Sequence, residues 1–209
     1  MAKKRWPGNA GIAIGPILFI IAILAILAAA IAAGSGSFTA STHSESNKTR
    51  ASGMIQVGEN LKVGMDRLVM ENGLAWGQWN INAASGTSNA NDLFSPTGGG
   101  ISSPSTALAG DPGNDIWYYP KGAVPQLGTT NEEQLAVLNV DEDVCNEINN
   151  RIYGISESPT GAVGDFTTAD VNATSYGGWP TNLHAKSIGC VADTTGGTKY
   201  YFYQVLYVQ

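Results

Sequence analysis

The sequence has no charged side chain between Trp6 and Ser44, and a basic run at residues 3–5 stands directly before that gap. Residues 12–33 are almost entirely Ile, Leu, Ala, Phe and Gly. A membrane-spanning helix needs about 20 apolar residues, whereas the apolar core of a secretory signal has about 7–15. The length therefore predicts a membrane-spanning helix over residues 12–33 after a short basic leader, residues 1–11.

The basic run predicts that the N-terminus stays in the cytoplasm and that residues 34–209 are translocated. A cleaved signal peptide is the alternative, because the Ala-rich end of the apolar stretch offers small residues to a signal peptidase. The Gly15-Pro16 pair favours retention, since a spanning helix tolerates proline in its first turns. We therefore expect residues 12–33 to remain in the mature protein.

Metal-binding and nucleophilic residue patterns are also missing. The chain has two cysteines and two histidines, with no CxxC or HxxxH spacing, which disfavours a zinc site. It has no GxSxG motif, and the glycines of residues 97–100 are not followed by the GK[ST] of a phosphate loop. The sequence thus predicts no catalytic residue, no metal ion and no cofactor, and hence a protein that is not an enzyme.

Three consecutive acidic residues, Asp141, Glu142 and Asp143, offer oxygen ligands to calcium. The alternating Asp spacing and glycine of a calcium loop are missing, however. The simpler interpretation is the start of a helix, where acidic side chains are stabilised by the helix dipole.

Charge is unevenly divided along the chain. Residues 34–209 hold 8 basic and 17 acidic residues, a formal balance of 8 − 17 = −9. Such an acidic region disfavours nucleic acid as a partner, because phosphate contacts need Lys and Arg. Its two cysteines, Cys145 and Cys190, indicate a disulfide if this region is exported and buried free thiols if it is cytosolic.

Apolar residues at helical spacing predict a helix over residues 49–71 that ends at Asn72-Gly73. A second helix is predicted after Asp141, with Gly154 as its end. Residues 85–130 are rich in Gly, Ser, Asn, Thr and Pro, which predicts long loops with room for short strands, and of the whole chain this part is least expected to have a rigid core. The expected packing face of the first helix comprises Met54, Val57, Leu61, Met65 and Leu68.

The C-terminus carries the clearest strand signal. Residues 186–208 are β-branched and aromatic on both sides of Gly196-Gly197, which predicts a β-hairpin with Cys190 on its first strand. Both faces of the second strand are largely apolar. We expect one of these faces to cover the helix of residues 49–71, which gives one α+β domain.

Tryptophan is the remaining candidate for binding chemistry. Trp76, Trp79, Trp117 and Trp179 are the right residue type for a sugar-binding platform. Ordinary packing of large aromatic side chains is the simpler explanation.

The order of these elements resembles the type IV pilin and pseudopilin superfamily. It consists of a basic N-terminus, an apolar helix, an amphipathic helix, variable loops and the stretches "VCNEINNRI" and "GCVADTTGGTKYYFYQVL". The resemblance implies a long N-terminal helix whose second half packs on a small antiparallel C-terminal sheet in a loop-rich, pilin-like domain, residues 34–209. It also implies a disulfide in the C-terminal region, which we expect between Cys145 and Cys190.

Pilins are processed after a glycine and carry Glu at the fifth mature position. Here the candidate cleavage sites follow Gly8 or Gly11, which places Ala13 or Pro16 at that position, and the apolar run contains no acidic residue. The chain therefore either stays uncut in the membrane or assembles by apolar packing alone.

The resemblance implies a structural subunit of a surface filament or secretion pseudopilus. It would be held in the bacterial inner membrane by residues 12–33, with its C-terminal domain in the periplasm or in an extracellular filament. Its partners would be copies of itself or other pilin-like subunits. The alternative is a monomeric, membrane-anchored binding protein that contacts a glycan or a protein through residues 85–130.

Overall fold

The computed structural model describes residues 14–81, 89–110, 116–128, 133–164, 166 and 178–209. The chain divides into two compact units, Met1–Glu45 and Ser46–Gln209. The sequence suggests a boundary earlier, after residue 33. Residues 34–45 continue a helix, and a helix makes its hydrogen bonds locally, so these residues group with the apolar residues before them.

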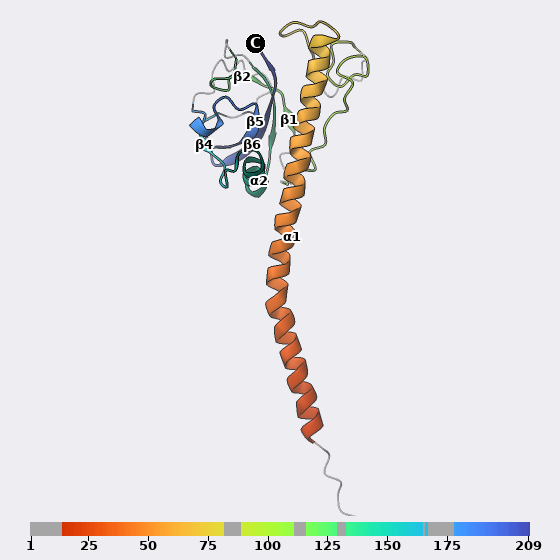
Figure 1. Cartoon of the computed structure of the whole chain (residues 1–209), viewed down its shortest axis with the longest axis vertical. Helices are drawn as coiled ribbons and strands as arrows, with labels where there is room; N and C mark the ends of the chain where they lie inside the picture. Colours follow the sequence, from red (N-terminus) through yellow and green to blue (C-terminus); the bar gives the residue numbers. More distant parts are fainter. Residues whose placement is uncertain (1–13, 82–88, 111–115, 129–132, 165, 167–177) are drawn as a thin grey trace, which may run out of the picture. The chain divides into compact units, whose positions relative to one another are not determined.

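The first element is the long helix α1 (Ile14–Met70; Figure 1). It runs without a break through the polar residues 34–48, whose conformation the sequence left open. The Glu71 N–H donates to the Arg67 carbonyl, the Leu74 N–H donates to the Leu68 carbonyl, and Gly73 has a φ of 67°. The helix therefore ends at the predicted Asn72-Gly73, where glycine adopts the left-handed conformation at no steric cost.

Within the described residues, no helix combines the length and the apolar composition needed to cross a membrane. The membrane-spanning role of residues 12–33 stays a prediction. Residues 12 and 13 and the two candidate cleavage sites, Gly8 and Gly11, lie outside the described part of the chain.

The globular unit contains one six-stranded sheet with the order β1-β3-β6-β5-β4, in which β2 also pairs with β3. Its strands are β1 (Trp117–Tyr118), β2 (Lys121–Gly122), β3 (Glu133–Asn139), β4 (Thr160–Gly161), β5 (Ile188–Asp193) and β6 (Lys199–Val208). The predicted hairpin is present as β5 and β6. The sheet is larger than the predicted one, because it includes strands from residue 117 onward. It is also not purely antiparallel, because β4 pairs parallel with β5. The fold is α+β.

The second half of α1 packs on one face of the sheet. Met54, Leu61, Met65 and Leu68 are buried, and Val57 is half-buried. Their neighbours on the strands include Leu138, Ala136, Phe202 and Leu206. A Cβ at Gly58 would lie 2.9 Å from Phe202 Cζ, so this glycine lets the helix backbone approach the sheet closely.

The opposite face of the sheet carries a separate core. The side chains of β3, β5 and β6 on this face include Val137, Val191, Tyr201 and Tyr203, all buried. Loop residues and the short 3-10 helix η1 (Thr181–Leu183) cover them. Both faces of β6 are thus buried, as its two largely apolar faces require.

The second helix, α2 (Glu142–Tyr153), begins after Asp141 and ends at Gly154, which has a φ of 70°. Asp141 occupies the N-cap position but makes no side-chain capping bond there. The Cys145–Cys190 disulfide joins α2 to β5. Next to it, the Asn149 side-chain amide donates to the Cys190 carbonyl (2.8 Å) and accepts from the Cys190 N–H (3.0 Å).

The loop that follows α1 is more ordered than its composition predicts. Leu93 is fully buried beside Leu61 and Met65, and Gly98 and Gly99 are buried as well. A Cβ at Gly98 would lie 2.0 Å from the Asp92 carbonyl oxygen, so only glycine fits. Residues 89–110 thus pack more closely than the sequence led us to expect, because their glycines permit close approach of the backbone.

Candidate functional site

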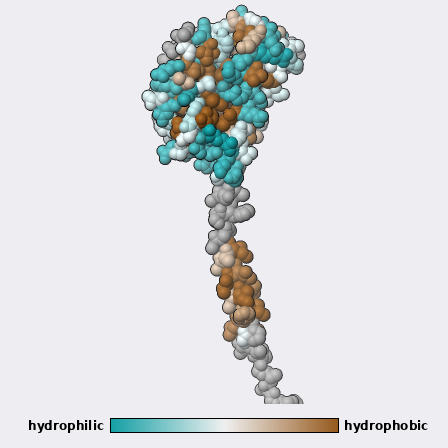
Figure 2. All heavy atoms as spheres, viewed as in Figure 1, coloured by the Kyte–Doolittle hydropathy of each residue, from teal (hydrophilic) through white to brown (hydrophobic). Residues whose placement is uncertain are grey.

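The first candidate surface is the segment of α1 over residues 17–32, here called the apolar segment. Its large side chains are exposed, from 40% at Ile23 to 72% at Ile31. Figure 2 shows it as a continuous hydrophobic stretch of helix. Consecutive residues, such as those of 17–21, project in all directions around a helix, so the exposure is not confined to one stripe. The exposed set is Ile17, Leu18, Phe19, Ile20, Ile21, Ile23, Leu24, Ile26, Leu27 and Ile31.

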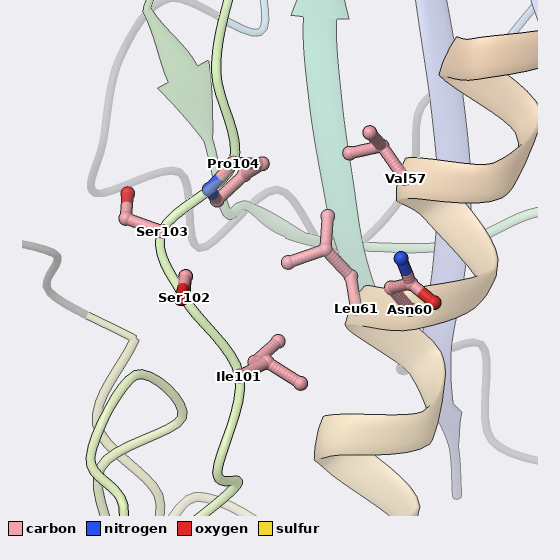
Figure 3. Close-up of a pocket in the computed structure, with 7 residues that line it drawn as sticks. All are labelled: Val57, Asn60, Leu61, Ile101, Ser102, Ser103 and Pro104. Carbon is pink, nitrogen blue, oxygen red and sulfur yellow. The ribbon is translucent and has the colours of Figure 1, made fainter.

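The second candidate is a groove between α1 and the loop of residues 101–104 (Figure 3). Its volume is about 350 Å³. Val57 and Leu61 project from the helix toward Ile101 and Pro104, and the polar lining residues are Asn60, Ser102 and Ser103. None of the described residues that line it is ionisable, and they offer contact to an apolar group.

The third candidate is a cleft of about 400 Å³ between the turn after α1 and the first two strands, here called the aromatic cleft. It is lined by Gly77, Trp79, Asn80, Ile81, Ile116, Trp117, Tyr118, Tyr119, Lys121 and Gln134. Of the four tryptophans considered above, Trp79 and Trp117 line it. Trp76 adjoins it, since its ring contacts Trp79 (5.4 Å between ring centroids) and lies 5.4 Å from Lys121 Nζ.

Trp179 lies elsewhere. It packs against Tyr203 on the opposite face of the sheet, with ring centroids 4.8 Å apart. The four tryptophans therefore do not form one platform, and for Trp179 the packing explanation holds. Lys121, Gln134 and Tyr119 were missed from the sequence, although the aromatic run of residues 117–119 was a usable signal.

A β-bulge shapes the aromatic cleft. The register between β3 and β6 shifts between Gln134 and Leu135, so that Gln134 pairs with Tyr207 while Leu135 pairs with Val205. Tyr207 consequently joins the cluster with Trp76 and Trp79 instead of following Tyr203 and Val205 to the other face. The bulge therefore interrupts the regular alternation of side chains along β6.

Burial raises the pKa of Tyr119, which lines the cleft, and of Glu133, which precedes Gln134 in the chain. Burial raises the pKa of the Tyr119 phenol, so this hydroxyl stays protonated. Burial also raises the pKa of the Glu133 carboxyl, and the hydrogen bond that its Oε2 accepts from the Val124 N–H (3.0 Å) opposes that shift.

His184 and Cys190 are of residue types that catalysis and metal binding commonly use, and both have structural partners. His184 Nε2 lies 3.2 Å from the Trp179 carbonyl oxygen, and Cys190 is held in the disulfide. No group of three or more His, Cys, Asp or Glu side chains in the described part of the chain is placed to hold a metal ion. Asp141, Glu142 and Asp143 instead form the start of α2.

No protein-family model, no curated protein and no solved structure matches this chain.

Proposed function

We propose that this protein is a structural subunit of a pilin-like surface filament or secretion pseudopilus. The observation that carries the proposal is the apolar segment, which exposes large aliphatic side chains on all sides. A helix that is hydrophobic all round is normally buried. Each Leu or Ile side chain that becomes fully buried contributes about 1.5–3 kcal/mol, so association of this segment is strongly favoured.

The occupant that covers the apolar segment is proposed to be the same segment of other copies. A single neighbour buries only one stripe of a helix, whereas a bundle of copies buries every side. The globular unit supports this assignment, because it packs the second half of α1 on a sheet and fixes its C-terminal region with a disulfide. This is the arrangement that a pilin-like subunit requires.

Before assembly, the apolar segment would be sheltered by the bacterial inner membrane, with the globular unit outside the cytoplasm. The disulfide supports export, because such bonds persist in oxidising compartments. Residues 12–33 contain no carboxylate that would pair with the amino terminus of a neighbouring copy. Assembly is therefore proposed to depend on apolar packing and to change little with salt concentration.

The test is cryo-electron microscopy of filaments sheared from cells that express the full chain. Ordered density for residues 17–32 in a helical core is the expected result. Leu24→Lys should abolish filaments, since it places a charge in that core. Val63→Lys is the matched control, because Val63 lies on the same helix and is 62% exposed in the globular unit. A detergent-solubilised protein that stays monomeric and never forms filaments would overturn the proposal in favour of an anchored binding protein.

A further inference from the structure

We propose that the aromatic cleft binds a carbohydrate by stacking a sugar ring against its aromatic side chains. Its volume of about 400 Å³ lies in the range of pockets that hold small ligands, about 300–1,000 Å³. Trp117 and Tyr119 in its lining and the adjoining Trp76 are half-buried residues. This binding does not depend on whether the chain forms filaments.

The chemistry of the lining matches that of a sugar ring. A pyranose presents apolar C–H groups on its faces and hydroxyl groups around its rim. The cleft offers aromatic rings to the faces, and it offers Asn80 and Lys121 near those rings. In such a site, a small number of polar groups among the aromatic side chains fixes the orientation of a small ligand.

Gln134 holds the two walls of the cleft together. Its side-chain NH₂ donates to the Tyr119 carbonyl (2.8 Å) and the Pro120 carbonyl (3.2 Å) on the strand side. Its Oε1 accepts from the Trp79 indole N–H (3.2 Å) on the turn side. Gln134 itself is only 2% exposed. The cleft is therefore formed before a ligand arrives, which lowers the entropic cost of binding.

Two donors in the lining lack hydrogen-bond partners within the described residues. They are Trp117 Nε1 and the Tyr119 hydroxyl, both shielded from solvent. Buried donors are normally paired, and an unpaired one costs about 1–3 kcal/mol. Because both atoms are shielded from solvent, they are not among the groups that the preformed cleft offers to a ligand.

The charge of the cleft narrows the ligand class. Lys121 is the one ionisable cation among the described lining residues, and no carboxylate lines the cleft. One cation is too few to bind a nucleic acid strand, which needs a basic groove. A glycan therefore fits best, and Lys121 should favour a sugar that carries a carboxylate.

The experiment titrates the full chain, kept in a sugar-free detergent, with cellohexaose, chitohexaose and oligogalacturonate while tryptophan fluorescence is recorded. The expected result is saturable quenching by at least one oligosaccharide. Trp76→Leu should weaken that binding about tenfold, the effect of losing one aromatic anchor. Lys121→Gln should weaken binding of the acidic oligosaccharide more than that of the neutral ones.

The matched control is Trp179→Phe, which alters a tryptophan on the opposite face of the sheet and should leave binding unchanged. Ile116→Asp guards against unfolding of the Trp76 variant, because Ile116 lines the cleft yet is 62% exposed. It should reduce binding while the melting temperature stays the same. No saturation by any of the three oligosaccharides up to about 10 mM, or unchanged wild-type affinity in both Trp76→Leu and Ile116→Asp, would overturn the proposal.

Discussion

The two halves of α1 share one backbone geometry and differ in what covers their side chains. In the apolar segment, Ile, Leu and Phe occupy every side of the helix and are exposed. In the second half, one face is buried against the sheet and the loop of residues 89–110, while Val63 and Met70 point outward. The first half thus has no amphipathic pattern, and the second half has a clear one.

This difference shows that the distribution of apolar residues around a helix reflects what surrounds it. A one-sided pattern specifies a partner on one side, and here the same chain supplies it. Apolar residues on every side of a helix indicate an apolar environment all around it. No described residue of this chain supplies that environment for the apolar segment. The glycines follow the same division, since a Cβ at Gly15 would meet nothing within 4 Å, whereas one at Gly58 or Gly64 would crowd side chains of the globular unit.

A buried charge should separate the two halves most strongly. Met65→Lys places an ammonium group in a fully buried position and should cost more than about 4 kcal/mol, enough to unfold the globular unit. Leu24→Lys should leave the thermal unfolding of that unit unchanged. Circular dichroism melting curves of the two variants measure this contrast. Equal melting temperatures would show that the two halves do not differ as described.

The disulfide should give the next largest effect. Replacing both Cys145 and Cys190 by Ser should destabilise the globular unit by about 4 kcal/mol, the chain-entropy value for a loop of this size. Guanidinium unfolding of the oxidised protein, the reduced protein and the double variant measures it. The last two should agree within about 1 kcal/mol, since both lack the same covalent bond. Two alkylatable thiols in the unreduced, denatured protein would refute the bridge.

Two substitutions on α1 test the one-sided pattern directly. Leu61→Ala should cost about 3 kcal/mol, within the usual 2–5 kcal/mol range for a buried Leu, because Leu61 is 1% exposed. Val63→Ala, two residues further on, should change the free energy of unfolding by less than about 0.5 kcal/mol. Urea denaturation of both variants measures these changes in the free energy of unfolding. A loss below about 0.5 kcal/mol for Leu61→Ala would mean that this face is open.

The smallest effect concerns Glu133. Burial raises the pKa of the Glu133 carboxyl in the folded protein. The protonated carboxyl therefore contributes stability that is fully present below the pKa of Glu133 in the unfolded chain. This contribution is lost as the pH rises through the pKa of Glu133 in the folded protein. Glu133→Gln should therefore flatten the fall in stability between acidic and neutral pH. Denaturation midpoints of both proteins across that range measure the slope. An unchanged slope would assign the pH dependence to another group.

The sequence was most informative where the pattern was long. The buried face of α1 and the hairpin of β5 and β6 were both readable, because helical spacing and alternation persisted over many residues. The strands β1, β2 and β4 were not predictable, since two residues carry no alternating pattern. Their place in the sheet depends on pairing with β3 and β5, which is a tertiary property.

The candidate sites also differ in how far the sequence predicts them. The apolar segment was visible in composition alone. The aromatic cleft was not, because it depends on the β-bulge that turns Tyr207 toward Trp76 and Trp79 and on the hydrogen bonds of Gln134. The cysteine pairing needed only an even count and an exported location, whereas the role of Asn149 beside it had no local signal.

The Asn149 amide has a consequence for how the disulfide forms. Its two hydrogen bonds fix the backbone of Cys190 against α2, one helical turn from Cys145, without using either sulfur atom. The two thiols are therefore held near each other whether or not they are joined, so each has a high effective concentration for the other. An oxidant meeting the folded, reduced chain would find the pair already positioned, and re-formation of the bond would be a local event rather than a search through 45 residues of chain.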